Sequence, residues 1–143
     1  MSIVDIKINE LYNKKEIILD VDKFNKVSTE SGIVGLAINI RNLILLRKKT
    51  YPTTPDMGIG IQDYKFEDLD DSLISSLQET IHSQINTYIP NTEVESVYVE
   101  KMANRHNKYN TIGVMVLIKP VSKIVFLLDQ DKVTKKILSE IYV

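Results

Sequence analysis

The feature that most constrains this chain is the change of character inside the segment Ile33–Phe66. The segment opens as a strongly apolar stretch and continues through a short basic run into a loop with two prolines and two glycines. A proline fixes its own φ angle and lacks an amide donor, so a helix cannot continue through Pro52 or Pro55. Gly58 and Gly60 permit backbone conformations that other residues avoid. The sequence therefore predicts a helix that runs into a loop of fixed shape, which either docks onto a partner or covers the domain's own core.

The composition is that of one ordinary globular domain. The 143 residues are 43% hydrophobic and 26% charged, with a formal net charge of −1 and no cysteine. This length suits one hydrophobic core, so residues 1–143 are expected to form a single domain. The balanced charge favours neither nucleic acid nor an anionic membrane as a partner, and disulfides are excluded. No apolar run approaches the roughly 20 residues of a membrane span, and the first residues alternate with charges, unlike a signal peptide.

Changes in the spacing of apolar residues divide the chain into elements. Helical spacing predicts a first helix from near Ser28 and a second that is capped by Asp70 or Asp71 and stopped by Pro90. From Glu93 the period changes to two, which predicts strands. An N-terminal arm is expected in residues 1–27, with a strand at Glu16–Val21. A core follows in residues 28–130, and its later strands are Thr111–Ile118 and Ser122–Leu128. Residues 131–143 are expected to form a short helix or a strand. The predicted fold class is α+β, with two helices packed on a small three-stranded, mainly antiparallel sheet.

The same pattern predicts which surfaces are covered. The first helix is apolar around most of its circumference, which indicates burial on more than one side, by the domain and by a partner chain. Thr111–Ile118 is nearly continuously apolar, which is typical of a strand covered on both faces. In the strand that starts after Glu93, alternation places Val97 and Val99 on one face, and Val94, Tyr98 and Met102 on the other. A three-stranded sheet has two open edges, and such edges recruit strands from other chains unless they are protected.

No constellation of residues predicts catalysis, a metal site or a cofactor. The two histidines, His82 and His106, have no second ligand at metal-binding spacing, and Gly58-x-Gly60 does not lie between a strand and a helix as a phosphate-binding loop does. The basic run is interpreted as the last turn of the first helix, where cations are favoured. Helix caps and solvated faces account for the carboxylates that a glycan hydrolase would need, which are Asp68, Asp70, Asp71, Glu93, Glu95 and Glu100. A second small positively charged cluster consists of Arg105, His106 and Lys108, and it is too small to form a DNA-binding surface.

The order of residues around the loop carries a family resemblance. The end of the helix holds Ile40, Asn42, Leu43, Ile44 and Leu45, and Pro52, Pro55, Met57, Gly58, Gly60 and Ile61 follow without a gap. This order resembles the pattern I-x-N-L-L-L-T-x-x-G-E-R-P-x-x-P-x-F-G-x-G-L of the baseplate wedge family of contractile phage tails, also called the tail-lysozyme-like or sheath-initiator family. The chain departs from it at Leu46, which replaces the threonine, and at Lys49, Thr50 and Tyr51, which stand in place of Gly-Glu-Arg.

A second motif of the family matches in part. The family has Glu-Pro-Arg after the second helix, followed by a strand, and here Pro90 matches the proline while Val94, Val97 and Val99 match the strand. Ile89 and Asn91 stand where the family has the glutamate and the arginine. In the family those charges are thought to hold the domain to a helical bundle of other wedge proteins. The resemblance therefore implies that the contact is apolar or polar here, or is made elsewhere.

The resemblance implies a structural, non-enzymatic role without a metal or cofactor. The resemblance implies a sheath-like handshake domain that stands in a sixfold ring of the virion baseplate, and a baseplate that is assembled in the host cytoplasm. Such a domain binds other wedge proteins, and its open sheet edges are extended by strands of the tail sheath protein. The implied partner-binding residues are Ile40, Leu43, Ile44, Pro52, Pro55, Met57, Gly58, Gly60, Pro90 and Asn91. Two alternatives stay open, a lysozyme-like hydrolase of cell-wall glycan and a stand-alone protein-binding module.

Overall fold

The computed structural model describes residues 16–18, 32–90, 92–102, 109–119, 122–131 and 133–143. The predicted cap near Ser28, most of the N-terminal arm, the site residue Asn91 and the cluster around His106 lie outside the described residues. The elements are the strand β1 (Glu16–Ile18), the helix α3 (Ile33–Leu45), the 3₁₀ turns η2 (Ile61–Asp63) and η3 (Phe66–Asp68), the helix α4 (Asp71–Tyr88), and the strands β2 (Val94–Met102), β3 (Tyr109–Ile118), β4 (Ser122–Asp131) and β5 (Ile137–Tyr142).

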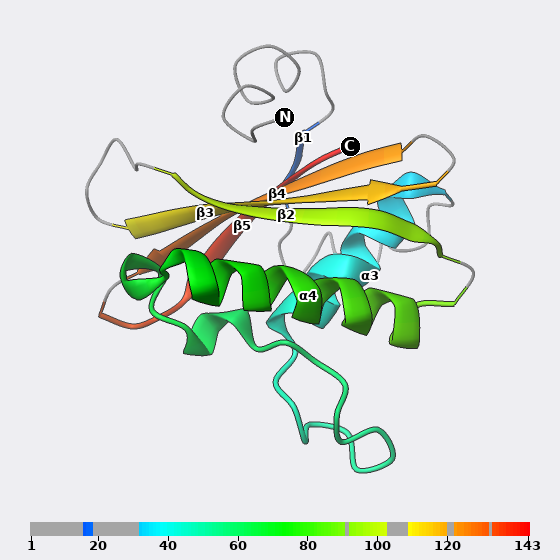
Figure 1. The fold of residues 1–143 in the computed structure, drawn as a ribbon, viewed down its shortest axis with the longest axis horizontal. Helices are drawn as coiled ribbons and strands as arrows, with labels where there is room; N and C mark the ends of the chain where they lie inside the picture. Colours follow the sequence, from blue (N-terminus) through cyan, green and yellow to red (C-terminus); the bar gives the residue numbers. More distant parts are fainter. Residues whose placement is uncertain (1–15, 19–31, 91, 103–108, 120–121, 132) are drawn as a thin grey trace.

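The fold is a two-layer α+β arrangement in which α3 and α4 cover one face of an antiparallel sheet (Figure 1). The strand order is β1-β5-β4-β3-β2, and every neighbouring pair is antiparallel. One core cluster joins the two helices, both 3₁₀ turns and the inner face of the sheet, and its largest buried side chains include Phe66 and Phe126. The predicted fold class is therefore confirmed in its layers, while the sheet is larger than expected.

Helix α4 is the element that the sequence predicts most closely. Asp70 caps it, because its Oδ1 accepts a hydrogen bond of 2.8 Å from the amide of Leu73. Leu77, Ile81 and Ile85 recur at four-residue spacing and are buried against the sheet. The helix ends before Pro90, as a proline requires.

Helix α3 supplies the centre of the core. Ala37, Ile40 and Ile44 are fully buried, and Leu43 is nearly so. The helix ends at Leu45, so the basic run Arg47–Lys49 follows the helix instead of forming its last turn, and that interpretation was wrong. The helix ends before the basic run because Leu46, the residue after Leu45, has an extended backbone conformation.

The sheet has five strands where three were expected. The meander β2-β3-β4 is confirmed, and β5 and the three-residue β1 extend it on the β4 side. Of the two alternatives for the C-terminal residues, the strand is confirmed and the helix is wrong. The four-residue spacing of Ile137 and Ile141 fits a helix and also fits the same face of a strand, so spacing alone could not separate them. Asp131 caps the β4–β5 turn, because its Oδ1 accepts from the amide of Val133 at 2.9 Å.

Strand β2 places Val94 on a face that alternation did not predict. A register shift between Val94 and Ser96 inserts a bulge, so Val94 shares the helix-facing side with Val97 and Val99. Tyr98 lies on the other face, as expected. Both faces of β3 are buried, at Val114 on the helix side and at Met115 on the opposite side, which confirms that this strand is covered on both faces. Among the described residues, no helix is long and apolar enough to cross a membrane.

Candidate docking groove

The loop between α3 and η2 is folded back on itself by main-chain hydrogen bonds. The amide of Lys49 donates to the carbonyl of Pro55 at 2.8 Å, and the amide of Met57 donates to the carbonyl of Thr54 at 3.1 Å. The loop then returns to the helix that it left, because the amide of Ile59 donates to the carbonyl of Leu43 at 3.2 Å. The predicted fixed shape thus has a physical basis in these closures.

The two loop glycines are required by this path. Gly58 has a φ of 120°, and a Cβ at this position would overlap the carbonyl oxygen of Leu46. Gly60 has a φ of 64°, in the left-handed region. These residues therefore let the loop pass directly against the end of α3, and their role is to shape the loop.

Helix α4 holds the same loop from the other side through one glutamine. The side-chain Oε1 of Gln84 accepts a hydrogen bond of 2.8 Å from the amide of Gly58. Its Nε2 donates to the carbonyl of Asp56 at 2.9 Å. The side-chain amide of Gln84 thus accepts one hydrogen bond from the main chain of the loop and donates another to it, which holds the loop against α4.

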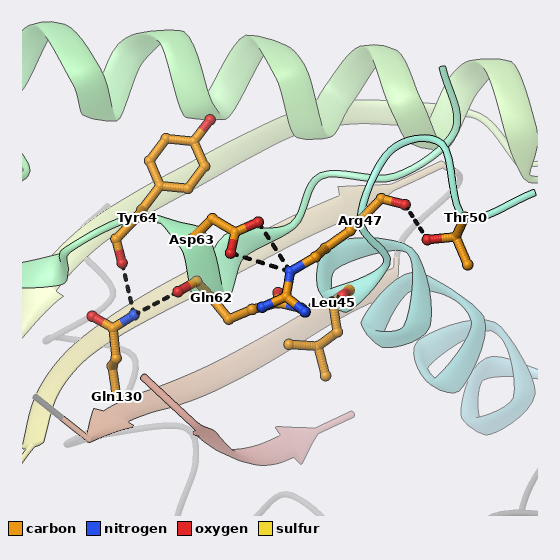
Figure 2. A network of polar contacts seen from close by, with 7 residues as sticks. All are labelled: Leu45, Arg47, Thr50, Gln62, Asp63, Tyr64 and Gln130. Carbon is orange, nitrogen blue, oxygen red and sulfur yellow. Dashed lines mark hydrogen bonds and ion pairs between the residues drawn. The ribbon is translucent and has the colours of Figure 1, made fainter. Parts of the chain in front are cut away.

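A second glutamine fixes the segment that follows the loop (Figure 2). Gln130, at the end of β4, is only 3% exposed. Its Nε2 donates to the carbonyls of Gln62 at 3.2 Å and Tyr64 at 2.7 Å, and its Oε1 accepts from the amide of Phe66 at 3.0 Å. Gln62 in turn donates to the carbonyl of Leu45 at 2.8 Å. The sheet, the 3₁₀ turns and the end of α3 are thereby joined in one polar network.

The exposed rim of this region carries an ion pair. The Nε of Arg47 lies 3.1 Å from both carboxylate oxygens of Asp63, as Figure 2 shows. Both side chains are largely exposed, so this pair contributes little to stability by itself. It occupies the one arginine of the predicted basic run, which leaves Lys48 and Lys49 as exposed cations there.

These contacts shape a groove of about 370 Å³ between the end of α3, the loop and the end of α4. Every side chain that lines it is uncharged, and the set consists of Asn39, Asn42, Leu43, Leu46, Tyr51, Met57, Tyr88, Ile89 and Pro90. We call this set the docking groove. Its apolar walls, two tyrosines and two asparagine amides suit the burial of an apolar side chain beside a few hydrogen bonds.

The structure divides the predicted partner-binding residues into three groups. Leu43, Met57 and Pro90 line the docking groove. Ile40 and Ile44 are fully buried in the protein's own core, so they offer no free surface. The others described are the exposed Pro52 and Pro55 in the loop, and Gly58 and Gly60, which are buried where the loop meets α3.

Sequence reasoning missed several residues of the groove. Asn39 lies three residues before the motif residue Asn42 on a helix whose other residues, apart from Arg41, are not polar, and this spacing was the available signal. Tyr88 continues the spacing of the apolar residues of α4, such as Ile81 and Ile85, but it is half-buried and lines the groove. Tyr51 stands where the family has an arginine, and the residue is 51% exposed.

The described residues offer no grouping suited to metal chemistry. No cluster of three or more histidine, cysteine or acidic side chains that could hold a metal ion occurs among them. Asp70 caps α4, and Glu93 forms an exposed ion pair of 3.2 Å with Lys119. His82 is half-buried on α4 and shares a hydrogen bond of 3.1 Å with Asn86.

Comparisons with known proteins point to one family. No protein-family model matches the chain. A curated relative, the baseplate wedge protein gp25 of Enterobacteria phage T4, is 25% identical over 92 residues, which are 64% of this chain and 70% of that protein. The fold resembles a crystal structure from Geobacter sulfurreducens described as a tail lysozyme, with a TM-score of 0.51, 16% identity, and coverage of 71% of this chain and 92% of that one. These findings confirm the resemblance of the chain to gp25-like baseplate wedge proteins.

Proposed function

We propose that this protein is a structural subunit of a contractile-tail baseplate in the virion. In this role it binds other wedge proteins through the docking groove, stands in a sixfold ring and accepts a strand of the tail sheath protein at its sheet. One observation carries the proposal, namely that the motif segments that resemble the wedge family converge on one groove, although they are separated in the chain. The similarity to a curated wedge protein supports the same role.

The groove has the rigidity that a docking site needs. The main-chain closures of the loop, Gln84 and the buried Gln130 hold its walls before any partner arrives. A surface that is already ordered loses less conformational entropy on binding, which leaves more of the contact energy as affinity. Tyrosine is one of the residue types that are enriched among the side chains that carry most of the binding energy in protein interfaces.

The family's charged contact is replaced by an apolar one in this proposal. Ile89 stands where the family has a glutamate, is half-buried, and lines the groove beside Pro90. An aliphatic side chain at this place cannot form an ion pair with a partner. The partner is therefore expected to insert an apolar side chain between Ile89, Met57 and Tyr51.

A matched pair of tyrosines tests the groove. Tyr51 lies in the groove and is 51% exposed, and Tyr98 lies on β2 outside it and is 42% exposed. We expect Tyr51→Ala to weaken binding to the wedge proteins encoded in the same genome by roughly tenfold or more, since interface tyrosines often contribute 2 kcal/mol or so. Tyr98→Ala is expected to change the same dissociation constant by less than about twofold. Equal effects of the two substitutions, or tight binding by Tyr51→Ala, would contradict docking at this groove.

The placement of Asp70 and Glu93 does not support a hydrolase that would use these two carboxylates. The neighbour in fold is called a lysozyme, but at 16% identity the likeness concerns the fold alone. Asp70 precedes α4 and Glu93 follows it, so an 18-residue helix of about 27 Å separates them. The two carboxylates of a glycosidase lie within roughly 10 Å of each other. We therefore expect no clearing of a peptidoglycan suspension by the purified protein, and clearing that Glu93→Ala and Asp70→Ala abolish would restore the enzyme hypothesis.

A further inference from the structure

One arginine of helix α3 is held between the helix and the sheet. The Nε of Arg41 donates to Oγ of Ser139 on β5 at 3.1 Å, and its Nη1 donates to Oδ1 of the neighbouring Asn42 at the longer distance of 3.5 Å. A guanidinium carries five N–H donors in a rigid fork, so these two contacts within the described part of the chain leave further donors on the Nη groups. The guanidinium is therefore positioned before any partner arrives and still has hydrogen bonds to donate.

No carboxylate pairs with Arg41 among the described residues, where the ion pairs are Arg47–Asp63 and Lys119–Glu93. Helix α3 itself contains no acidic residue. Arg41 is nevertheless half-buried, and burial lowers the pKa of Arg41, because desolvation disfavours the charged form. The free protein therefore removes part of this charge from water without the attraction that would offset the loss of hydration.

The acidic residue next to Ser139 lies on the other face of the sheet. Glu140 follows Ser139 on β5, and successive side chains of a strand point to opposite faces. The hydroxyl of Tyr142, which packs on the face away from the helices, donates to Oε2 of Glu140 at 2.8 Å. A charge that neutralises Arg41 is thus a charge that β5 does not supply.

Arg41 lies next to the docking groove. Asn42, whose Oδ1 accepts from Arg41, is one of the residues that line the groove. Every lining side chain is uncharged, so the groove by itself selects a partner only by shape and polarity, and Arg41 adds a positive charge at the Asn42 side. The cations that follow the helix, Lys48 and Lys49, are exposed, and exposed ion pairs contribute little. Arg41, which is positioned and partly desolvated, is the cation better suited to select a partner.

We propose that Arg41 determines the charge of the partner that the docking groove accepts: a partner seated in the groove places the carboxylate of an aspartate or glutamate on the guanidinium, beside Asn42. The inference rests on the proposed function, in which other wedge proteins occupy the groove. It adds selection by charge to a groove whose own lining is uncharged. Part of the desolvation of Arg41 has already occurred in the free protein, so less of this cost remains when the ion pair forms.

Substitutions of Arg41 test the charge in the complex with the wedge protein that binds the wild type. Arg41→Gln keeps a donor for Ser139 but removes the charge, and it is expected to weaken binding about tenfold or more. Arg41→Lys keeps the charge and is expected to retain more affinity. Arg47→Gln is the matched control, because Arg47 is exposed and already paired with Asp63, and a change of less than about twofold is expected. Unchanged affinity in Arg41→Gln, or equal losses in the glutamine and lysine variants, would overturn the proposal.

A purely structural role for Arg41, as a link between α3 and β5, predicts different results. Arg41→Gln would then lower the midpoint of urea unfolding, and salt would affect the affinity of the wild type and the variant equally. We expect a midpoint no lower than that of the wild type, because the substitution removes a partly desolvated charge. We also expect added salt to weaken the wild-type complex more steeply than the Arg41→Gln complex, because salt screens an ion pair. Equal salt dependence would overturn the proposal, whatever the midpoint.

A carbodiimide reagent identifies the partner's carboxylate directly. The reagent couples a lysine amine to a carboxylate in contact with it as an amide, and takes up the water that is lost. In the complex of Arg41→Lys, mass spectrometry is expected to find position 41 joined to an aspartate or glutamate of the wedge protein. The wild type, which keeps Lys48 and Lys49, is the control for links formed elsewhere. A complex of Arg41→Lys that forms no link at position 41 would contradict the proposed contact.

The outcomes separate this inference from the proposed function. If no wedge protein of the same genome binds the wild type, the proposed function fails and the inference fails with it. If Tyr51→Ala weakens binding and Arg41→Gln does not, docking at the groove stands, and the selection of a carboxylate by Arg41 is wrong. If both substitutions weaken binding, the groove and the charge are both supported.

Discussion

Lys49 retains the backbone of a glycine at a position where the related family has one. Its φ is 68°, in the left-handed region that side chains with a Cβ disfavour. The turn persists because the amide of Lys49 is held by the carbonyl of Pro55. The loop geometry is therefore kept even though the residue that suits it best has been replaced.

This strain can be removed by one substitution. We expect Lys49→Gly to stabilise the protein by roughly 0.5–1 kcal/mol, because relief of the left-handed strain exceeds the added entropy of the unfolded chain. The measurement is the free energy of unfolding in urea. Lys48→Gly is the control, since Lys48 does not have a positive φ, and it is expected to be neutral or destabilising. A loss of stability in Lys49→Gly would contradict this account of the turn.

At the scale of elements, two glutamine side chains supply the hydrogen-bond partners that the main chain finds within helices and strands elsewhere. Gln130 satisfies the main chain of the segment around η2 and η3, and Gln84 satisfies the loop before it. These segments are neither long helices nor strands, so their amides and carbonyls lack regular partners. The side-chain amides replace those partners and join α4 and β4 to the groove.

The buried one of these two amides is expected to matter more for stability. Gln130→Met fills a similar volume but leaves the amide of Phe66 and the carbonyls of Gln62 and Tyr64 without their partner, at a cost of roughly 2–4 kcal/mol. Gln84→Met is expected to cost about 1 kcal/mol, because its site is more accessible to water. Midpoints of urea unfolding measure both. Equal midpoints for the two variants would show that burial of Gln130 does not set the cost.

At the scale of the whole molecule, the protein encloses more of its apolar surface than its sequence indicates. Residues of α3 such as Ile40 and Ile44 are covered by the protein itself, and α4 caps one edge of the sheet. The docking groove is therefore the surface on which the proposed binding of partners depends. One core cluster joins the helices, the 3₁₀ turns and the sheet.

A single shared core predicts a single unfolding transition. The chain has seven tyrosines and no tryptophan, so tyrosine fluorescence reports tertiary structure and far-ultraviolet circular dichroism reports secondary structure. We expect the two signals to change with the same midpoint in urea, as in two-state unfolding of small domains. Gln130→Met should lower both midpoints equally. Separate midpoints would mean that the helices and the sheet are held by different cores.

The elements could be predicted where one local cause decides the outcome. The N-cap at Asp70, the stop before Pro90 and the stripe of α4 follow from rules that act within a few residues. The bulge after Val94 and the strand at Ile137–Tyr142 could not be predicted in this way, because each depends on pairing with a strand distant in the chain. The docking groove was predicted in part, since its motif residues were found but Asn39 and Tyr88 were not.

By itself, the sequence determined the two helices, the rigid loop between them and the central meander, because apolar spacing, prolines and glycines act locally on the backbone. Only the tertiary structure decided that Ile40 and Ile44 are core and that Gln130 reaches across the fold to the 3₁₀ turns. It also decided that Gln78 of α4 accepts from the amide of Val99 on the edge strand β2, and that Arg41 of α3 donates to Ser139 of β5. The physical reason is that burial and hydrogen-bond partners are set by residues far apart in the chain, which meet only when the layers pack.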